Sequence, residues 1–380
     1  MILARFLACC AWLCAALCVC ALPGVLRGDS TWEITPQSRK ALDRGLQWLE
    51  RNQGPEGNWS TNNLGLVSMG LLAFLADGHA PGRGRHGPAE KAALDYVLHN
   101  AKPSGLLNIA GRHNDMYNHG LSTFVLGQAY GMTSDSRVGP ALDRALKVID
   151  QCQCQDGGWQ YEAHSRETGN DLSLAVMQAK ALRSAVDSGF EVRPSVIERA
   201  IRDVREHYQP KGCGRDAPEE EQQKLPGRFT YSKGGGQETL AMAAAGVVCL
   251  QEFAQYGDWR IPKNIEIIEQ AVRDMEKGDR NNPPFDPYTN YYVAQALYQV
   301  GGEPWQRCYP LLRDRLVSSQ MHEDNPENDG GWRPSGHVGG KPGVLYQTAV
   351  ACFILAIPNR YLPILQEGRI DSLRKQYEKK

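Results

Sequence analysis

From residue 36 onward the chain alternates two kinds of segment in which apolar residues recur at three- and four-residue steps, the spacing of one helix face. The first kind is amphipathic and rich in charge, as at 41–53, 141–153, 196–208 and 267–277. The second kind is nearly free of charge, at 64–76, 120–132, 172–185, 239–253, 291–300 and 348–357. A helix that is apolar nearly all round is covered on all sides, so the second kind predicts inner helices and the first predicts outer helices. No stretch shows sustained period-two alternation, which predicts an all-α chain.

The six charge-poor segments are spaced at similar intervals. The first polar residue of each stands 52 to 67 residues after the previous one, and these six residues are Asn63, His119, Asp171, Glu238, Asn290 and Gln347. Helix pairs of similar length laid end to end indicate a repeat architecture. An open solenoid keeps a polar binding face, whereas inner helices as apolar as these suit a closed ring. The sequence therefore predicts a single (α/α)6 toroid of six helical hairpins over residues 36–366, followed by a charged C-terminal tail at 367–380.

A short phrase recurs where outer helices are expected to end. It reads QGPEGNW at 53–59 and QCQDGGW at 153–159, and DGGW returns at 329–332. Glycine permits the left-handed conformation that ends a helix, and the glutamine amide can bond free backbone groups there. The tryptophan can cover the apolar end of the hairpin. We therefore expect structural roles for these turns rather than contact with a substrate.

The same turns carry a resemblance to a known family. Residues 44–59 read R-G-x2-W-L-x3-Q-x3-G-x-W, and residues 144–159 read R-A-x2-V-I-x3-Q-x3-G-x-W. This pattern resembles the QW repeat of squalene and oxidosqualene cyclases, and so the superfamily of terpenoid cyclases and protein prenyltransferases, whose shared domain is the (α/α)6 toroid. The resemblance implies an apolar central cavity that binds or acts on an isoprenoid-like small molecule.

The chain lacks the motifs that carry the chemistry of that family. Squalene cyclases start a carbocation with a DxDD motif, and this chain has none; Asp171 stands alone in GNDLSLA. The segment at 339–353 resembles the stretch that carries the zinc histidine of prenyltransferases, but it has Gln347 there. We therefore expect no cyclisation of squalene, no bound metal and no cofactor. Long isoprenoids are expected to bind with affinity on the order of micromolar.

Candidate site residues come from the evenly spaced polar positions. In a closed ring these positions would face one end of the central cavity, where Asp171, Glu238 and His119 could serve as acid, base or ligands. Asn63, Asn290 and Gln347 complete the predicted polar ring. Helix capping explains the Asn and Asp positions equally well, because these residues are preferred caps. Aromatic side chains near the same end are candidates for a cavity wall, and these are Tyr117, Tyr288, Tyr291 and Tyr346.

Net charge, the N-terminal segment and the cysteines indicate in which compartment the protein acts and which partners it lacks. With 42 basic and 43 acidic residues the formal net charge is −1, which gives no electrostatic case for nucleic-acid binding. Arg5 precedes an uncharged run over 6–26, which predicts that residues 1–28 are a signal peptide or an N-terminal membrane anchor. The protein is thus expected to be exported, with membrane contact only through an uncleaved N-terminus. Cys249 and Cys352 lie in apolar segments and are expected to be buried free thiols.

Three functions remain open at this point. The first is the isoprenoid-binding or isoprenoid-converting toroid that the resemblance implies. The second is a non-catalytic scaffold that binds a lipid, a peptide or a protein partner. The third is a carbohydrate-active enzyme, because (α/α)6 barrels also host glycosidases and lyases that use paired carboxylates, for which Asp171 and Glu238 are candidates.

Overall fold

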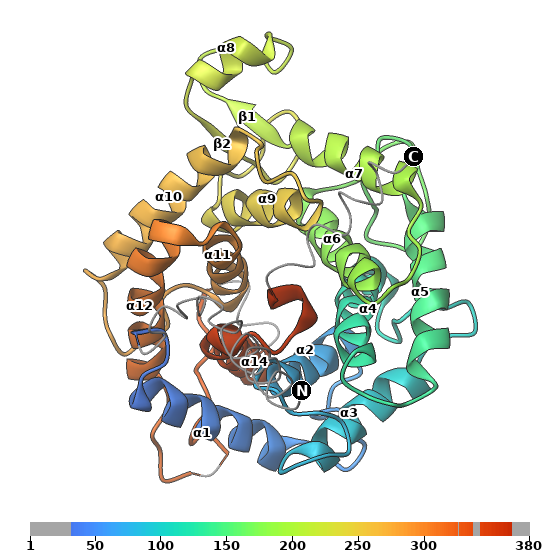
Figure 1. Cartoon of the computed structure of the whole chain (residues 1–380), viewed down its shortest axis with the longest axis vertical. Coiled ribbons are helices and arrows are strands. Elements are labelled where there is room, and N and C mark those ends of the chain that lie inside the picture. The colour runs from blue at the N-terminus through green and yellow to red at the C-terminus, as the bar shows by residue number, and fades with distance from the viewer. Residues whose placement is uncertain (1–31, 326, 337–342, 367–380) are drawn as a thin grey trace, which may run out of the picture.

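The computed structural model describes residues 32–325, 327–336 and 343–366, and within them the chain forms a ring of helical hairpins (Figure 1). The outer helices are α1 (Pro36–Asn52), α3 (Gly87–His99), α5 (Val138–Cys152), α7 (Pro194–Glu206), α10 (Arg260–Met275) and α12 (Gly302–Ser318). The inner helices are α2 (Leu64–Ala76), α4 (Asp115–Tyr130), α6 (Leu172–Asp187), α9 (Leu240–Glu252), α11 (Pro287–Val300) and α14 (Gly343–Ala356). This arrangement confirms the predicted (α/α)6 toroid.

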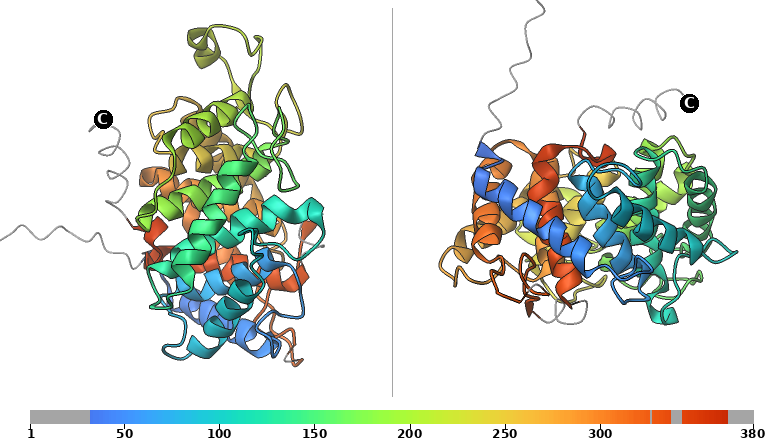
Figure 2. Two further views of the ribbon diagram at one scale, coloured as in Figure 1. Left: turned by 90° about the vertical axis from the view of Figure 1, so that its right-hand side faces the viewer. Right: turned by 90° about the horizontal axis from the view of Figure 1, so that it is seen from below.

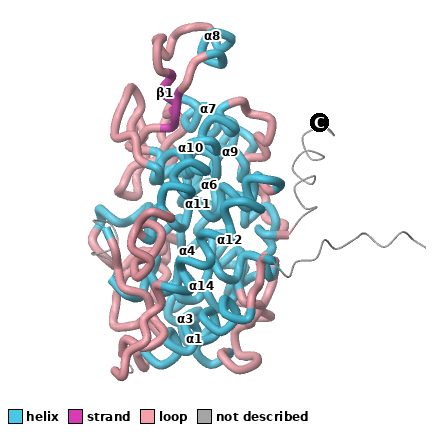
Figure 3. The backbone as a smooth tube through the Cα atoms, turned by 90° about the vertical axis from the view of Figure 1, so that its left-hand side faces the viewer, coloured by secondary structure: helices cyan, strands magenta, loops and turns pink. Residues whose placement is uncertain are grey.

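One part of the ring departs from the helical plan. The segment between α7 and α9 forms a two-stranded antiparallel sheet, in which β1 (Tyr208–Pro210) pairs with β2 (Gly227–Phe229). The short helix α8 (Glu219–Lys224) lies between the strands, and this unit projects beyond the ring at the top of Figure 3. Phe229 at the base of β2 is fully buried, so the projection is fixed to the core at that point.

The recurring turns make the same hydrogen bonds in all three copies. In each copy the glutamine amide donates to the carbonyl of the glycine in its own turn and to a carbonyl of the next outer helix. The pairs of acceptors are Gly57 and Ala89 for Gln53, Gly157 and Val196 for Gln153, and Gly330 and Ala41 for Gln320. Each glutamine therefore ties the end of one outer helix to its neighbour.

The tryptophans of these turns are also structural. Their indole N–H groups donate to the last turns of the preceding outer helices, and the pairs are Trp59 with Leu49, Trp159 with Ile149, and Trp332 with Leu316. All three rings are less than a tenth exposed. A buried indole with its donor satisfied is a packing element, which is the role that the sequence predicted.

The ring closes between its last and first outer helices. Gln320 donates to Ala41 of α1, and Arg44 of α1 lies 2.5 Å from a carboxylate oxygen of Asp329. The indole of Trp48 donates to the carbonyl of Glu327. Figure 2 shows α1 in blue lying beside the orange α12. Contacts between residues nearly 300 positions apart thus complete the toroid.

The centre of the ring is not the uniformly apolar cavity that the sequence predicted. Large rings from the inner helices fill much of it, among them Phe124, Tyr291 and Phe353, each less than 2% exposed. Lys180 of α6 lies among them, 3.2 Å from a carboxylate oxygen of Glu252 and with Nζ 4.4 Å from the ring centroid of Phe124. A buried charge needs a partner of opposite charge, and Glu252 of α9 supplies it.

The termini fall outside this description. The predicted signal segment at 1–28 and the predicted tail at 367–380 both lie outside the described residues. Among the helices of the described residues, none combines the length and apolar character that a membrane crossing requires. The described thiols of Cys249 and Cys352 are free and buried, as predicted.

Candidate functional site

The end of the ring at which the inner helices begin gathers a group of polar side chains around Asp171. Asp171 is the N-cap of α6, and its Oδ1 accepts the backbone N–H groups of Ser173 and Leu174 at 3.0 and 3.3 Å. The Ser173 hydroxyl donates to the same oxygen. The hydroxyl of Tyr161 donates to Oδ2 at 2.5 Å. Both oxygens of this carboxylate are therefore oriented by fixed donors.

Tyrosines from four different segments surround this carboxylate. Tyr161 shares a hydrogen bond with Tyr231, and Tyr117 shares one with Ser173. The rings of Tyr117 and Tyr161 lie 5.7 Å apart between centroids. We call the group formed by Tyr117, Tyr161, Asp171, Tyr231 and Tyr288 the mouth cluster. Its four tyrosines are all half-buried, so the cluster is open to solvent on one side.

The far side of the mouth cluster comes from α11 and α14. Tyr288 of α11 packs edge-on against Tyr292, with ring centroids 4.9 Å apart. Asp286 is the N-cap of α11, where it accepts the backbone N–H groups of Tyr288 and Thr289. Burial and the charge of Asp286 raise the pKa of Tyr346 on α14. A second capping carboxylate thus belongs to this end of the ring.

The tyrosines of the mouth cluster keep their protons at neutral pH. Burial, the neighbouring Tyr292 and the charge of Asp171 raise the pKa of Tyr288 well above its usual range. Burial and the hydrogen bond to Asp171 raise the pKa of Tyr161, and burial, Tyr288 and Asp171 do the same for Tyr117. A protonated tyrosine donates and accepts hydrogen bonds and does not act as a base. The cluster is therefore equipped to bind polar groups.

Several polar atoms near this end of the ring have no hydrogen-bond partner among the described residues. They are both amide atoms of Gln347 and Oδ1 of Asn290. Gln347 is fully buried, and Asn290 is 1% exposed. An unpaired buried polar group carries a penalty of roughly 1–3 kcal/mol, which a polar ligand would relieve. This is the strongest sign of a ligand site at this end.

The structure brings together only some of the residues predicted from the sequence. Asp171, Tyr117 and Tyr288 meet in the mouth cluster, whereas Asn63 is an ordinary N-cap of α2 that accepts from Leu66. Tyr291 lies deeper, with its ring 5.3 Å from that of Phe353. The prediction that six equivalent residues share one cavity is thus wrong in part.

His119 does not face the mouth cluster. Its Nδ1 accepts the backbone N–H of Leu107, and its Nε2 donates to the carbonyl of Ala145 in the outer helix α5. Burial lowers its pKa to about 4, so the ring is neutral and fully buried. His119 therefore joins an inner helix to an outer one, and the predicted acid or base role is corrected to a structural one.

Glu238 is also placed away from Asp171. It precedes α9, whose N-cap is Thr239, so the predicted register is off by one residue. Its exposed carboxylate lies 2.9 Å from Lys211 and 3.4 Å from Arg228. The hydrogen bond from Lys211 lowers its pKa. Glu238 is thus engaged by two surface cations, and it makes none of the hydrogen bonds that hold Asp171.

Four residues at this end of the ring were not predicted from the sequence, three of them around Asp171 and one a second capping acid. Tyr161, Ser173 and Tyr231 contact Asp171 or its partners, and Asp286 caps α11. An Asp followed by Pro287 at the first helical position is a usable sequence signal for a helix start. Tyr161 and Tyr231 lie in irregular segments and carry no such signal. Within the described residues no group of three or more His, Cys, Asp or Glu side chains could hold a metal ion.

Comparison with known proteins gives structural relatives without sequence relatives. No family model matches the chain, and no curated protein matches it. An inactive variant of the alpha-1,6-mannanase of Salegentibacter sp., in complex with alpha-1,6-mannotetrose, has a TM-score of 0.53 at 11% identity, covering 87% of this chain and 100% of that one. Cellobiose 2-epimerase from Spirochaeta thermophila has a TM-score of 0.57 at 14% identity, covering 93% of this chain and 100% of that one.

These neighbours correct the family resemblance. The chain shares its fold with two (α/α)6 toroids named for saccharide substrates, which overturns the likeness to squalene cyclases and prenyltransferases and the isoprenoid-like ligand that it implied. The glutamine–tryptophan turns that carried the likeness are fully used in joining hairpins. These turns are structural elements of the toroid and do not indicate which ligand it binds.

Proposed function

We propose that this protein binds neutral carbohydrate at the mouth cluster. The observation that carries the proposal is a group of protonated tyrosines around one oriented carboxylate, beside buried polar atoms without partners. Sugars present hydroxyls that both donate and accept, together with apolar C–H faces. Tyrosine hydroxyls, a carboxylate and an amide meet the first requirement, and tyrosine rings meet the second.

Two further observations support a saccharide over an isoprenoid. Asp171 and Gln347 would be left buried against hydrocarbon by an apolar ligand, at the full penalty for unpaired polar groups. The structural neighbours include an alpha-1,6-mannanase and a cellobiose 2-epimerase. The leader-like segment at 1–28 supports export to a compartment where such saccharides occur.

Binding, rather than hydrolysis, is the function that the geometry favours. Hydrolysis of a glycosidic bond uses one carboxyl group as an acid and a second as a base or nucleophile. Asp171 has both oxygens engaged by donors, and Asp286 accepts two backbone N–H groups and the Thr289 hydroxyl at 2.6 Å. These two carboxylates act as helix caps and as fixed acceptors.

Calorimetric titration tests this proposal. The purified protein should bind alpha-1,6-mannotetrose or cellobiose in a saturable manner, and Tyr161→Phe should weaken binding about tenfold through the loss of one hydrogen bond to the sugar. Asp171→Asn should weaken it further while keeping the helix cap, because Asn caps helices as well as Asp does. Tyr96→Phe is the matched control, since Tyr96 is half-buried on α3 and its hydroxyl makes only a 3.5 Å contact. Absence of saturable binding to both saccharides would contradict the proposal.

A further inference from the structure

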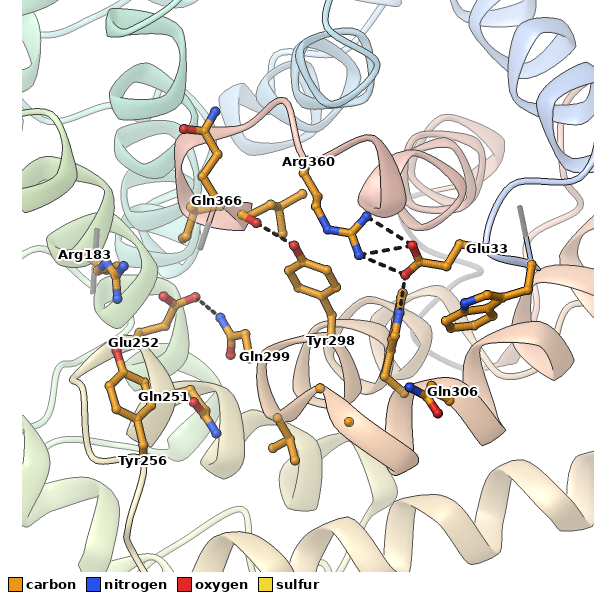
Figure 4. Close-up of a pocket in the computed structure, with 17 residues that line it drawn as sticks. Glu33, Arg183, Gln251, Glu252, Tyr256, Tyr298, Gln299, Gln306, Arg360 and Gln366 are labelled. Carbon is orange, nitrogen blue, oxygen red and sulfur yellow. Dashed lines mark hydrogen bonds and ion pairs between the residues drawn. The ribbon is translucent and has the colours of Figure 1, made fainter. Parts of the chain in front are cut away.

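The opposite end of the ring holds a cavity of about 440 Å³ (Figure 4). It lies where the inner helices α9 and α11 end and where residues 357–366 cross the ring, and its lining includes Arg183, Glu252, Gln299 and Arg360. Its volume is within the range of about 300–1,000 Å³ typical of small-molecule sites. No residue of the mouth cluster contributes to it.

Hydrogen-bonded polar side chains of α9 and α11 line one part of this cavity. Glu252 is 2% exposed, and its Oε1 accepts from Lys180 at 3.2 Å and from the Gln299 amide at 2.9 Å. Oε1 of Gln299 is buried without a hydrogen-bond partner among the described residues. Figure 4 shows Glu252 and Gln299 side by side at the edge of the open space. An acceptor fixed beside an unpaired amide oxygen is suited to a ligand that brings hydroxyl donors.

The charges around the cavity are compensated pairwise. Arg183 lies 2.8 Å from Asp187, and Lys180 lies 3.2 Å from Glu252. Glu33 lies 3.0 Å from Arg360 on the opposite wall. Because these cations and anions are already paired with one another, a charged ligand would find no free opposite charge to offset the cost of its own desolvation. The pattern favours a neutral polar ligand.

Aromatic rings complete the wall and rim. Among the described residues four large apolar side chains are exposed, and two of them, Trp32 at 36% and Tyr256 at 41%, line this cavity. Trp305 and Tyr298 also line it, with ring centroids 5.2 Å apart. Rings of this kind present apolar faces beside polar edges, which suits the C–H faces of a sugar.

We propose that this cavity is a second binding site, for a neutral mono- or disaccharide, separate from the mouth cluster. The 13 residues of α9 place the two ends about 20 Å apart. The centre between them is filled by buried side chains, including Tyr291 and Lys180. The inference rests on this cavity's own residues and stands whether or not the mouth cluster binds a ligand.

Titration of cellobiose and glucose into an Asp171→Asn protein, in which binding at the mouth cluster is weakened, tests this site. Saturable binding should persist there, and Tyr256→Ala and Gln299→Ala should each weaken it at least tenfold. Tyr130→Ala is the matched control, because Tyr130 is 40% exposed but does not line the cavity. It should leave the affinity unchanged. Glucuronic acid and glucosamine should bind at least tenfold more weakly than glucose.

Three outcomes would overturn the inference. They are no saturable binding of either neutral sugar to the Asp171→Asn protein, an affinity in that protein that neither Tyr256→Ala nor Gln299→Ala changes, and equal affinity for the charged sugars. Binding to the parent protein that disappears in Asp171→Asn would place the ligand at the mouth cluster, which supports the proposed function and removes this second site. Binding that is lost only in the Tyr256→Ala and Gln299→Ala proteins would place the ligand in this cavity and would remove the proposed binding at the mouth cluster.

Discussion

Gly157 shows, for a single residue, why the recurring turn requires glycine. Its φ is +103°, a conformation that disfavours any side chain, and a Cβ placed there would lie 2.1 Å from the carbonyl oxygen of Arg199 in α7. The turn must approach the next outer helix this closely for Gln153 to reach its second acceptor, Val196. Glycine is therefore required both by the backbone angle and by the approach.

A paired substitution separates these two requirements. Gly235 also has φ of +103° but no atom within 4 Å of an added Cβ. Gly157→Ala should lower the free energy of unfolding by about 3 kcal/mol, whereas Gly235→Ala should lower it by about 1 kcal/mol, the cost of the backbone angle alone. Urea unfolding measures both values. Equal losses in the two variants would show that the close approach contributes nothing.

Glu90 makes stability depend on pH. It is fully buried, and neither carboxylate oxygen has a hydrogen-bond partner among the described residues. Burial raises its pKa from 4.5 to about 7. Because the folded pKa lies above the unfolded one, the contribution is present at low pH and is lost as pH rises through about 7; it amounts to roughly 3 kcal/mol.

Comparison of Glu90→Gln with the parent protein isolates this effect. The hydrogen bond that His79 donates to Asp77 raises the pKa of His79, so this pairing also weakens as pH rises. Only the difference between the two proteins therefore belongs to Glu90. Between pH 5 and pH 8 the urea midpoint of unfolding should fall less steeply in the Glu90→Gln variant than in the parent protein. Parallel curves for the two proteins would contradict the prediction.

At the scale of elements, the sequence predicted the inner helices well and the outer ones less completely. Inner helices are apolar all round, so their composition alone marks them. The outer helices α3 and α12 have weaker amphipathic patterns, and α12 contains Pro310 within its span. The start of α9 differs from the predicted one by one residue, because Thr239, a good cap, directly follows Glu238. Cap preference decided the boundary there.

The glutamine of each turn holds one hairpin to the next. The Gln153 amide donates to Gly157 and Val196 at 2.9 Å each, and its oxygen accepts from Arg199. Gln153→Ala should lower the free energy of unfolding by about 2–3 kcal/mol, since buried acceptors are left unpaired. Gln155→Ala, two residues on and exposed, is the control and should change it by less than about 0.5 kcal/mol. A similar small effect in both would remove the proposed tie between α5 and α7.

At the scale of the whole molecule, the site could not be derived from the chain alone. Asp171 was visible as a lone acid before an inner helix, but its partners Tyr161 and Tyr231 come from irregular segments on either side of α6 and α7. Only ring closure fixes which segments meet at one end. The family resemblance misled for a related reason, because the repeated turns encode how hairpins join and are independent of the ligand.

Carbohydrate binding at the end of the toroid around Asp171 is the proposal on which this function rests. A crystal structure of the protein with alpha-1,6-mannotetrose tests it most directly. We expect the sugar in the mouth cluster, with its hydroxyls within hydrogen-bond distance, about 2.5–3.2 Å, of Asp171 and of the Tyr161 or Tyr288 hydroxyl. A mouth cluster that stays empty at saturating ligand, or a sugar bound with none of these residues in contact, would contradict it.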